Sequence, residues 1–389
     1  MGTVPTSDQR HPHFEPDEPG SLTINDIYWR DLAPWLEECG YMLRPRFRPG
    51  WIPSWKLKGT GGPVMVHEDA QGSLRHQIID AVRMRDGLVV VLKRIQKDDH
   101  PHEVAIHSFL TSEPLASDPK NHCVPLLEVL EPPSLPGTQL LVMKLLRMYE
   151  DPHFDTVGEA VDYFRQIFEG VQFMHKHLVA HRDCGSGNIM MDGQHLYPNG
   201  FHPTFQWLNM DHSARAKHTT RTRAPPKYYL IDFGISVRFS PDSLPRTEVP
   251  IKGADRTVPE FEGDGCLDPL DPFATDVYYL GNMIREDFLD GQYEEDRPDH
   301  EGLEGFEFMR PLVNDMVKRN PEERPKIDEV VERFEKIVSR LSTWKLRSRV
   351  QGKMHYTLLS IPSIVRHWRR RISFMIKGVP PIPSYREIN

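Results

Sequence analysis

The spacing of apolar residues changes from strand-like to helical along this chain, and that change most constrains its fold. Ile78–Val82 and Leu88–Ile95 are short apolar runs joined by Asp86-Gly87, a pattern that predicts a β-hairpin. A further strand is expected over Gln139–Met143. From Val157–Lys176 onward to about residue 341, apolar residues recur mostly at helical spacing. Strands followed by helices predict an α+β fold with a small sheet-rich lobe and a larger helical lobe.

Length and composition exclude several classes of protein. The chain has 389 residues, 38% of them hydrophobic, which is enough for a sizeable core and excludes wholesale disorder. No apolar run approaches the roughly 18 residues that a membrane-spanning helix needs. The four cysteines are scattered, and the polar, Pro/His-rich start does not resemble a secretory signal. We therefore expect a protein of the cytoplasm, or of the nucleus, that is neither secreted nor membrane-spanning.

The first 62 residues are expected to precede the main fold. Residues 1–20 have the composition of a disordered terminus, and residues 21–62 are expected to form an N-terminal helical extension. A short helix should begin after Thr23 or Asn25 and end at Gly40. The proline-rich stretch Arg44–Trp55 should be extended, with its tryptophans packed on the body of the protein.

Three short motifs point to a specific chemistry. His181-Arg182-Asp183 is followed, five positions after the aspartate, by Asn188. Asp232-Phe233-Gly234 comes after a strand-like run, and Lys93 ends the apolar strand that begins at Leu88. With these residues in this order, the chain resembles the eukaryotic protein kinase superfamily, as a divergent member.

Further elements extend the resemblance over roughly residues 63–340. Val258-Pro259-Glu260 stands where the family has Ala-Pro-Glu, and Arg324 fits the arginine that pairs with that glutamate. Asp276 matches the aspartate that anchors the catalytic loop. The resemblance implies a two-lobed protein-kinase-like fold, with an N-lobe at 63–146 and a C-lobe at 147–340.

The resemblance also implies roles for individual residues. Asp183 would accept the proton of the attacking hydroxyl, while Asn188 and Asp232 would bind Mg²⁺. Lys93 would contact the ATP phosphates, held by Glu103; Glu113 is a weaker alternative because a proline follows it. Arg182 would read a phosphate on the activation loop, 235–257. The adenine base would lie among five residues of the two lobes: Val91, Met143, Lys144, Leu145 and Met190.

Two departures from the family pattern suggest reduced activity. At the usual spacing before Lys93, the three glycines of the phosphate-covering loop fall on Gln71, Ser73 and His76. Gly185 stands where serine/threonine kinases carry a lysine, so a cation for the γ-phosphate is missing. Removal of one such charge costs on the order of 10²–10³ in rate.

The expected function is the transfer of the γ-phosphoryl group of ATP, with Mg²⁺, to serine or threonine hydroxyls of a protein substrate. A kinase-fold scaffold, or pseudokinase, that binds nucleotide weakly or not at all is the main alternative. A small-molecule kinase of the same superfold is disfavoured, because Val258-Pro259-Glu260 and Arg324 belong to a peptide-binding platform. We expect no nucleic-acid partner.

Two segments lie outside the motif set. The insert 193–226 is basic and histidine-rich, but its histidine spacings fit no compact metal site, so a solvent-exposed loop or substrate-docking flap is expected. The tail 341–389 holds ten Lys/Arg and one Asp/Glu, against 38 and 55 in the first 340 residues. Its apolar residues from Ile364 to Ile376 recur at helical spacing. Such a basic helix could bind an anionic membrane surface or a partner, or fold back on the acidic body.

Overall fold

The computed structural model describes residues 20–57, 62–73, 75–263, 268–291, 302–352 and 361–385. The chain divides into two compact units, of which the first comprises residues 1–95, 127–145 and 199–216. The second comprises residues 96–126, 146–198 and 217–389. The α+β class expected from the sequence is confirmed. The unit boundaries differ from the expected ones, because residues 96–126 belong to the second unit and part of the insert belongs to the first.

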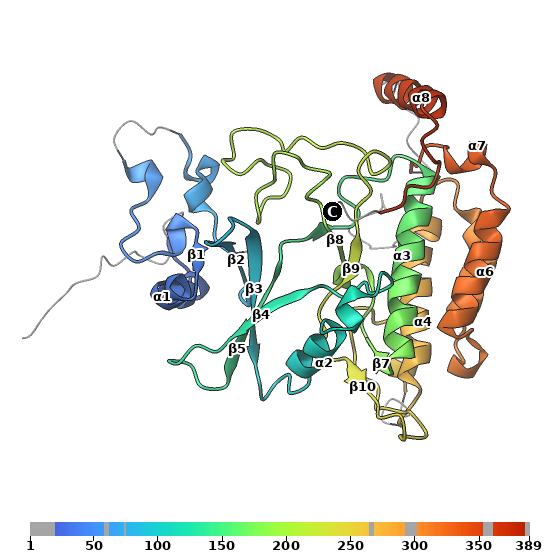
Figure 1. The fold of residues 1–389 in the computed structure, drawn as a ribbon, viewed down its shortest axis with the longest axis horizontal. Coiled ribbons are helices and arrows are strands. Elements are labelled where there is room, and N and C mark those ends of the chain that lie inside the picture. Colours follow the sequence, from blue (N-terminus) through green and yellow to red (C-terminus); the bar gives the residue numbers. More distant parts are fainter. Residues whose placement is uncertain are drawn as a thin grey trace, which may run out of the picture. The chain divides into compact units, whose positions relative to one another are not determined.

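The first unit is built on a five-stranded sheet with the strand order β1-β2-β3-β5-β4 (Figure 1). The hairpin predicted from Asp86-Gly87 is present, with Ile78 of β2 opposite Lys93 of β3 in an antiparallel pair. β1 pairs antiparallel with β2 at the edge of the sheet. The strands are β1 (Tyr41–Leu43), β2 (Ile78–Arg83), β3 (Val89–Gln96), β4 (Leu126–Leu130) and β5 (Thr138–Lys144).

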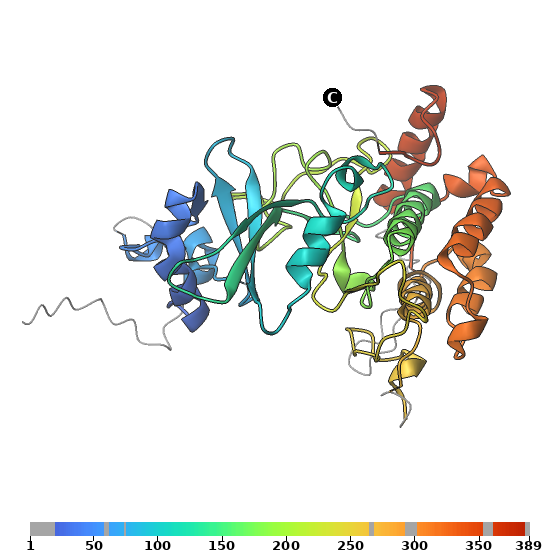
Figure 2. The ribbon, with the colours of Figure 1, turned by 60° about the horizontal axis from the view of Figure 1, so that its bottom comes forward.

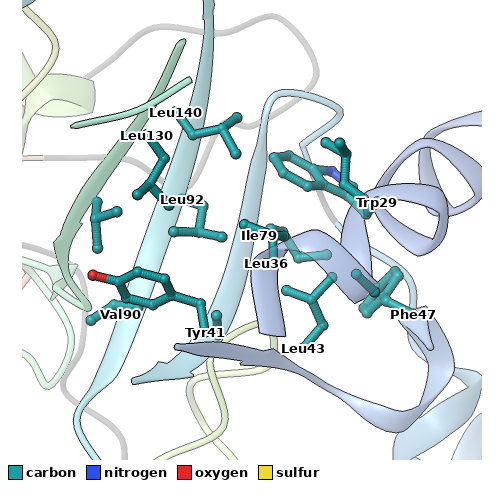
Figure 3. Packing of buried hydrophobic residues seen from close by; sticks show 14 residues of the cluster. Trp29, Leu36, Tyr41, Leu43, Phe47, Ile79, Val90, Leu92, Leu130 and Leu140 are labelled. Atoms are coloured by element: carbon teal, nitrogen blue, oxygen red, sulfur yellow. The ribbon is translucent and has the colours of Figure 1, made fainter. Parts of the chain in front are cut away.

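Helix α1 (Ile24–Glu38) covers one face of this sheet (Figure 3). It begins with a capping box, in which Thr23 Oγ1 accepts a hydrogen bond from Asp26 N and the Asp26 carboxylate accepts one from Thr23 N. Trp29 and Leu36 are fully buried against the apolar residues of the strands. Each such side chain contributes about 1.5–3 kcal/mol. The segment 21–62 is therefore not a separate helical extension: it supplies both a strand and a helix to the core of the sheet.

In the connection from β1 to β2, the stretch Arg44–Trp55 is not extended throughout as we expected: the 3₁₀ turn Pro45–Phe47 lies within it, and a second, Ser54–Lys56, begins near its end. The buried Arg46 guanidinium holds this connection, donating hydrogen bonds to the Asp26 carboxylate (2.9 Å) and to the carbonyl oxygens of Gly20 and Asp69. The Asp69 carboxylate in turn accepts the indole N–H of Trp51 at 3.0 Å. Buried polar groups replace the continuous apolar pattern of a strand here, so periodicity could not reveal this packing.

The second unit is mostly helical, and helix α3 (Val157–Lys176) is its centre. Its bounds agree with the sequence prediction. Phe168 of α3 packs edge-on against Phe334 of α6, with 5.2 Å between the ring centroids. Figures 1 and 2 show α3 beside α4 and α6. The other helices are α2 (Glu103–Leu110), α4 (Pro272–Ile284), α5 (Arg310–Met316), α6 (Ile327–Ser339), α7 (Thr343–Leu346) and α8 (Ile361–Ile376).

Two small antiparallel sheets in the second unit carry the loops that hold the motifs. One contains β6 (Arg147–Met148), β8 (Ile189–Met191) and β9 (Tyr228–Leu230), and the other pairs β7 (Val179–Ala180) with β10 (Val237–Arg238). None of the helices over the described ranges is long and apolar enough to cross a membrane.

The insert 193–226 lies wholly within the described residues and contains no helix or strand. It is only partly the solvent-exposed loop that we expected: Trp207 and Met210 are exposed, but Leu196, His202 and Arg221 are buried. The alternative, a substrate-docking flap, stays a prediction. The Arg221 guanidinium donates hydrogen bonds to the hydroxyl of Tyr228 (2.7 Å) and the carbonyl oxygen of Tyr149 (2.6 Å). An arginine in a basic, loop-like stretch gives no sequence signal for such burial.

Candidate functional site

The loop that follows β7 carries His181, Arg182 and Asp183, and a buried carboxylate of α4 fixes its backbone. Asp276 accepts hydrogen bonds from the backbone N–H groups of His181 (2.8 Å) and Arg182 (2.6 Å). The anchoring role expected for Asp276 is thus confirmed. Arg182 has a φ of +69°, a conformation that costs energy for any residue with a Cβ and is held here by these bonds. Asp276 consequently holds the backbone of the two residues directly before Asp183.

The Asp183 carboxylate is oriented by two donors. The side-chain amide of Asn188 donates to Asp183 Oδ2 at 2.7 Å and to the Asp183 carbonyl oxygen at 2.9 Å. The backbone N–H of Ala254 donates to Asp183 Oδ1 at 2.8 Å. Burial raises the pKa of Asp183, and the negative charge of Asp232 raises it further, although the two hydrogen bonds act in the opposite direction. Asp183 thus has the character of a base whose proton affinity is increased.

Asp232 and Asn188 are placed by the same pair of strands. Asn188 precedes β8, Asp232 follows β9, and the carbonyl oxygen of Asn188 accepts the N–H of Ile231 at 3.0 Å. Asp232, like Arg182, has a left-handed backbone, with a φ of +65°. The two carboxylates, Asp183 and Asp232, repel each other, which favours a cation near them.

The donor set fits a magnesium ion. Mg²⁺ usually binds one or two protein carboxylates and completes its shell with water and substrate phosphates. Asp232 offers a carboxylate, and the Asn188 amide group, whose nitrogen faces Asp183, offers its oxygen on the other side. Within the described part of the chain, no group of three or more His, Cys, Asp or Glu side chains could hold a metal by itself. This site would therefore bind the ion together with a phosphate ligand.

Phe233 and Gly234 connect this cluster to helix α2. The buried Phe233 ring packs against the rings of His107 on α2 and of His181, with ring centroids 4.9 Å and 5.5 Å away. A Cβ added to Gly234 would lie 3.2 Å from Glu103 Oε2. Glu103 is thus buried beside the Asp232-Phe233-Gly234 segment rather than exposed on its helix.

The expected nucleotide-contacting residues of the first unit share one face of its sheet. On β3, Val90 and Leu92 belong to the core under α1, so the alternation of a strand places Val91 and Lys93 on the opposite face. Val142 belongs to the same core, which places Met143 of the neighbouring β5 on the face of Lys93.

The remaining candidate nucleotide-contacting residues are divided between the two units. Lys144 and Leu145 continue from Met143 in the first unit, where the Leu145 N–H donates to the Val89 carbonyl oxygen at 3.4 Å. Met190 lies on β8 of the second unit, with Glu103, Asp183, Asn188 and Asp232. The structure therefore forms two sets of candidate residues, one on each unit. The pairing of Lys93 with Glu103 stays a prediction.

The activation-loop segment approaches Asp183 through its backbone. The Arg182 guanidinium donates to the carbonyl oxygen of Val249. A Cβ on Gly253 would lie 2.3 Å from Asp183 Oδ1 and 2.4 Å from Tyr279 Oη, so only glycine fits. Sequence reasoning did not single out Gly253, Ala254 or Tyr279, because one glycine in a predicted loop carries no pattern.

A buried ion pair holds the segment after this loop. Arg324 and Glu260 form a bidentate pair with two N–O distances of 2.7 Å, and both side chains are excluded from solvent. The pairing expected from the sequence is thus confirmed.

In comparisons with known proteins, no family model and no curated protein matches this chain. The functional argument accordingly depends on the geometry of the residues described above.

Proposed function

We propose that this chain is a divergent protein kinase that transfers the γ-phosphoryl group of ATP to serine or threonine hydroxyls of a protein substrate. The observation that carries the proposal is the convergence of Asp183, Asn188 and Asp232 in the second unit, with a strained, left-handed backbone at Arg182 and Asp232. Strain of this kind is retained where the surrounding structure fixes it, often at functional sites.

The chemistry needs little more than positioning and charge. When bound, Mg²⁺ neutralises charge that develops on the phosphate oxygens. Asn188 and Asp232 would hold the ion, while Asp183 would orient the attacking hydroxyl and accept its proton. The increased proton affinity of Asp183 suits a base. The Arg324–Glu260 pair supports a protein substrate, since it steadies the Val258-Pro259-Glu260 segment that resembles a peptide-binding platform.

A specific observation also favours the second candidate, a kinase-fold scaffold. Asp183 Oδ1 already accepts the Ala254 N–H, so part of its hydrogen-bonding capacity is used by the chain itself. Gly185 supplies no cation near it. The two functions differ in whether the protein binds nucleotide and whether it transfers phosphate.

The test of the enzyme is phosphate labelling of the purified chain and of a generic protein substrate with Mg·ATP. The isosteric substitution Asp183→Asn removes the base, and we expect labelling to fall by about 10²-fold or more. Asp98→Asn makes the same change at an exposed turn and should leave the rate unchanged. Labelling that persists in Asp183→Asn would rule out Asp183 as the base.

A further inference from the structure

Helix α8, in the basic tail, is attached to the second unit by one of its faces. Arg370 forms an ion pair with Asp155, just before α3, at 2.8 Å, and His367 lies 3.4 Å from the same carboxylate. The chain after the helix passes so close to α3 that a Cβ on Gly158 would lie 2.0 Å from the carbonyl oxygen of Pro381. Phe374, a residue of α8 itself, is buried. The tail is therefore folded onto the body, one of the arrangements expected from the sequence.

Arg371 holds two tryptophans at the side of this helix. Its guanidinium lies 3.7 Å from the ring centre of Trp344 and 4.9 Å from that of Trp368, and it donates to the Trp344 carbonyl oxygen at 3.2 Å. The centroids of the two indole rings are 5.9 Å apart. Although Arg371 itself is buried, Trp344 and Trp368 are 62% and 42% exposed. Two large aromatic side chains are thus held at the surface in a fixed arrangement.

A row of apolar side chains runs along the exposed side of α8, with the exposed Arg369 beside it. Its exposed residues recur at spacings of three and four, which places them along one side of a helix. Isolated exposed apolar residues are ordinary, but a continuous row beside two exposed tryptophans marks an interaction surface. The row consists of Val365 (52% exposed), Trp368, Ile372 (48%), Met375 (41%) and Ile376 (80%). We call these five residues, together with Trp344, the tail face.

The charged side chains in the described parts of the tail are all basic, although Asp155 of the body lies against α8. In the described parts of the tail, 341–352 and 361–385, there are eight Lys/Arg and no Asp or Glu. Arg369 is exposed on the same helix as the apolar row, and Lys377 is exposed in the turn directly after it. Tryptophan favours the headgroup level of a bilayer, aliphatic side chains favour the layer beneath it, and lysine and arginine attract anionic lipid.

We propose that the tail face binds the surface of an anionic membrane. The helix stays docked on the body through Asp155 while its apolar row enters the interface, so that the protein lies on the membrane without crossing it. The proposal does not rest on the proposed enzymatic function, because none of its residues belongs to the candidate site.

Co-sedimentation with vesicles tests the proposal on the full chain. We expect binding to phosphatidylcholine vesicles that contain phosphatidylserine, little binding to pure phosphatidylcholine, and weaker binding at high salt. The double substitution Ile372→Asp/Ile376→Asp should reduce binding about tenfold or more, since it places two like charges in the apolar row. Ile24→Asp is the matched control: Ile24 is 78% exposed on α1, outside the tail, and its substitution should change nothing.

A spectroscopic measurement keeps the test decisive even if the double variant folds poorly. Brominated anionic lipids should quench the fluorescence of the wild-type chain, and Trp344→Phe/Trp368→Phe should lose most of that quenching. Absence of binding to anionic vesicles, or binding that the aspartate pair leaves unchanged, would overturn the proposal. The tail face would then serve a protein partner instead.

Discussion

At the residue scale, main-chain groups as well as side chains shape the surroundings of Asp183. Gly253 brings its backbone within van der Waals contact because it lacks a side chain, and Ala254 contributes only its N–H group. Asp276 fixes the other side of the loop from a fully buried position. The position of the candidate base therefore depends on main-chain atoms as well as on the side chains of Asn188 and Asp276.

Gly253→Ala should disturb this arrangement. Its Cβ would need the space of Asp183 Oδ1 and Tyr279 Oη, so that either the loop or the carboxylate must move. We expect a loss of about 1–3 kcal/mol in the free energy of unfolding, measured by urea denaturation, together with a lower labelling rate. At Gly187 an added Cβ meets nothing within 4 Å, and Gly187→Ala serves as the control for stability. Equal stability of the two variants would contradict the predicted clash.

The ion pair Arg324–Glu260 allows a second prediction, with a matched control. Arg324→Ala leaves Glu260 buried without its partner, and we expect a loss of about 3–5 kcal/mol in the free energy of unfolding. Arg165 and Glu335 make the same bidentate contact at the surface, so Arg165→Ala should cost about 0–1 kcal/mol. Chemical denaturation of both variants compares a buried with an exposed ion pair; Arg324 also donates to backbone carbonyl oxygens, which adds to its expected loss. Similar losses in the two variants would show that burial is not the deciding factor.

At the scale of elements, strand β9 connects the body of the second unit to Asp232. The segment around His122 runs along β9, with the Leu230 N–H donating to the His122 carbonyl oxygen (2.7 Å) and the Val124 N–H donating to that of Leu230 (3.0 Å). The His122 ring donates from Nδ1 to the Tyr228 carbonyl oxygen at 2.8 Å. A neutral, buried imidazole thus supports the strand that positions the candidate metal ligand.

This imidazole makes the unit sensitive to acid. Burial lowers the pKa of His122 from 6.5 to about 4, although its bond to Tyr228 acts in the opposite direction. Between pH 6.5 and 4 the unfolded chain therefore binds a proton that the folded chain does not, and stability falls as the pH falls. In the wild type, this proton should lower the free energy of unfolding by on the order of 3 kcal/mol between pH 6.5 and pH 4, and His122→Gln should remove that difference. Unfolding measured at the two pH values checks this. His195→Gln, at an exposed position, is the control substitution.

At the scale of the whole molecule, nucleotide binding tests the role proposed for Lys93. If Lys93 contacts the phosphates, Lys93→Ala should lose the stabilisation that Mg·ATP gives the wild type. That stabilisation is about 2.7 kcal/mol at a ligand concentration a hundred times the Kd. Lys97→Ala, at an exposed position, is the control. A wild-type chain that Mg·ATP does not stabilise would favour the scaffold.

The sequence reveals elements whose side chains alternate or recur regularly, and residues that belong to a compact motif. Helix α3, the β2–β3 hairpin, Asp276 and the Arg324–Glu260 pair were predictable for that reason. The β1–β2 connection and the insert were not, because buried arginines such as Arg46 and Arg221 hold them by hydrogen bonds to distant backbone. The contact of Gly253 with Asp183 was also hidden, since it depends on the absence of a side chain.

The strand β1 has a consequence for what counts as the minimal folding piece of this protein. A fragment that began at residue 63, where the kinase resemblance begins, would lack β1 and α1. The outer edge of β2 would then present unpaired N–H and C=O groups, and the sheet face that receives Trp29 would lie open to water. Bare edges and apolar faces of this kind invite aggregation between copies. The autonomous unit is thus defined by packing, and it starts well before the first recognisable motif.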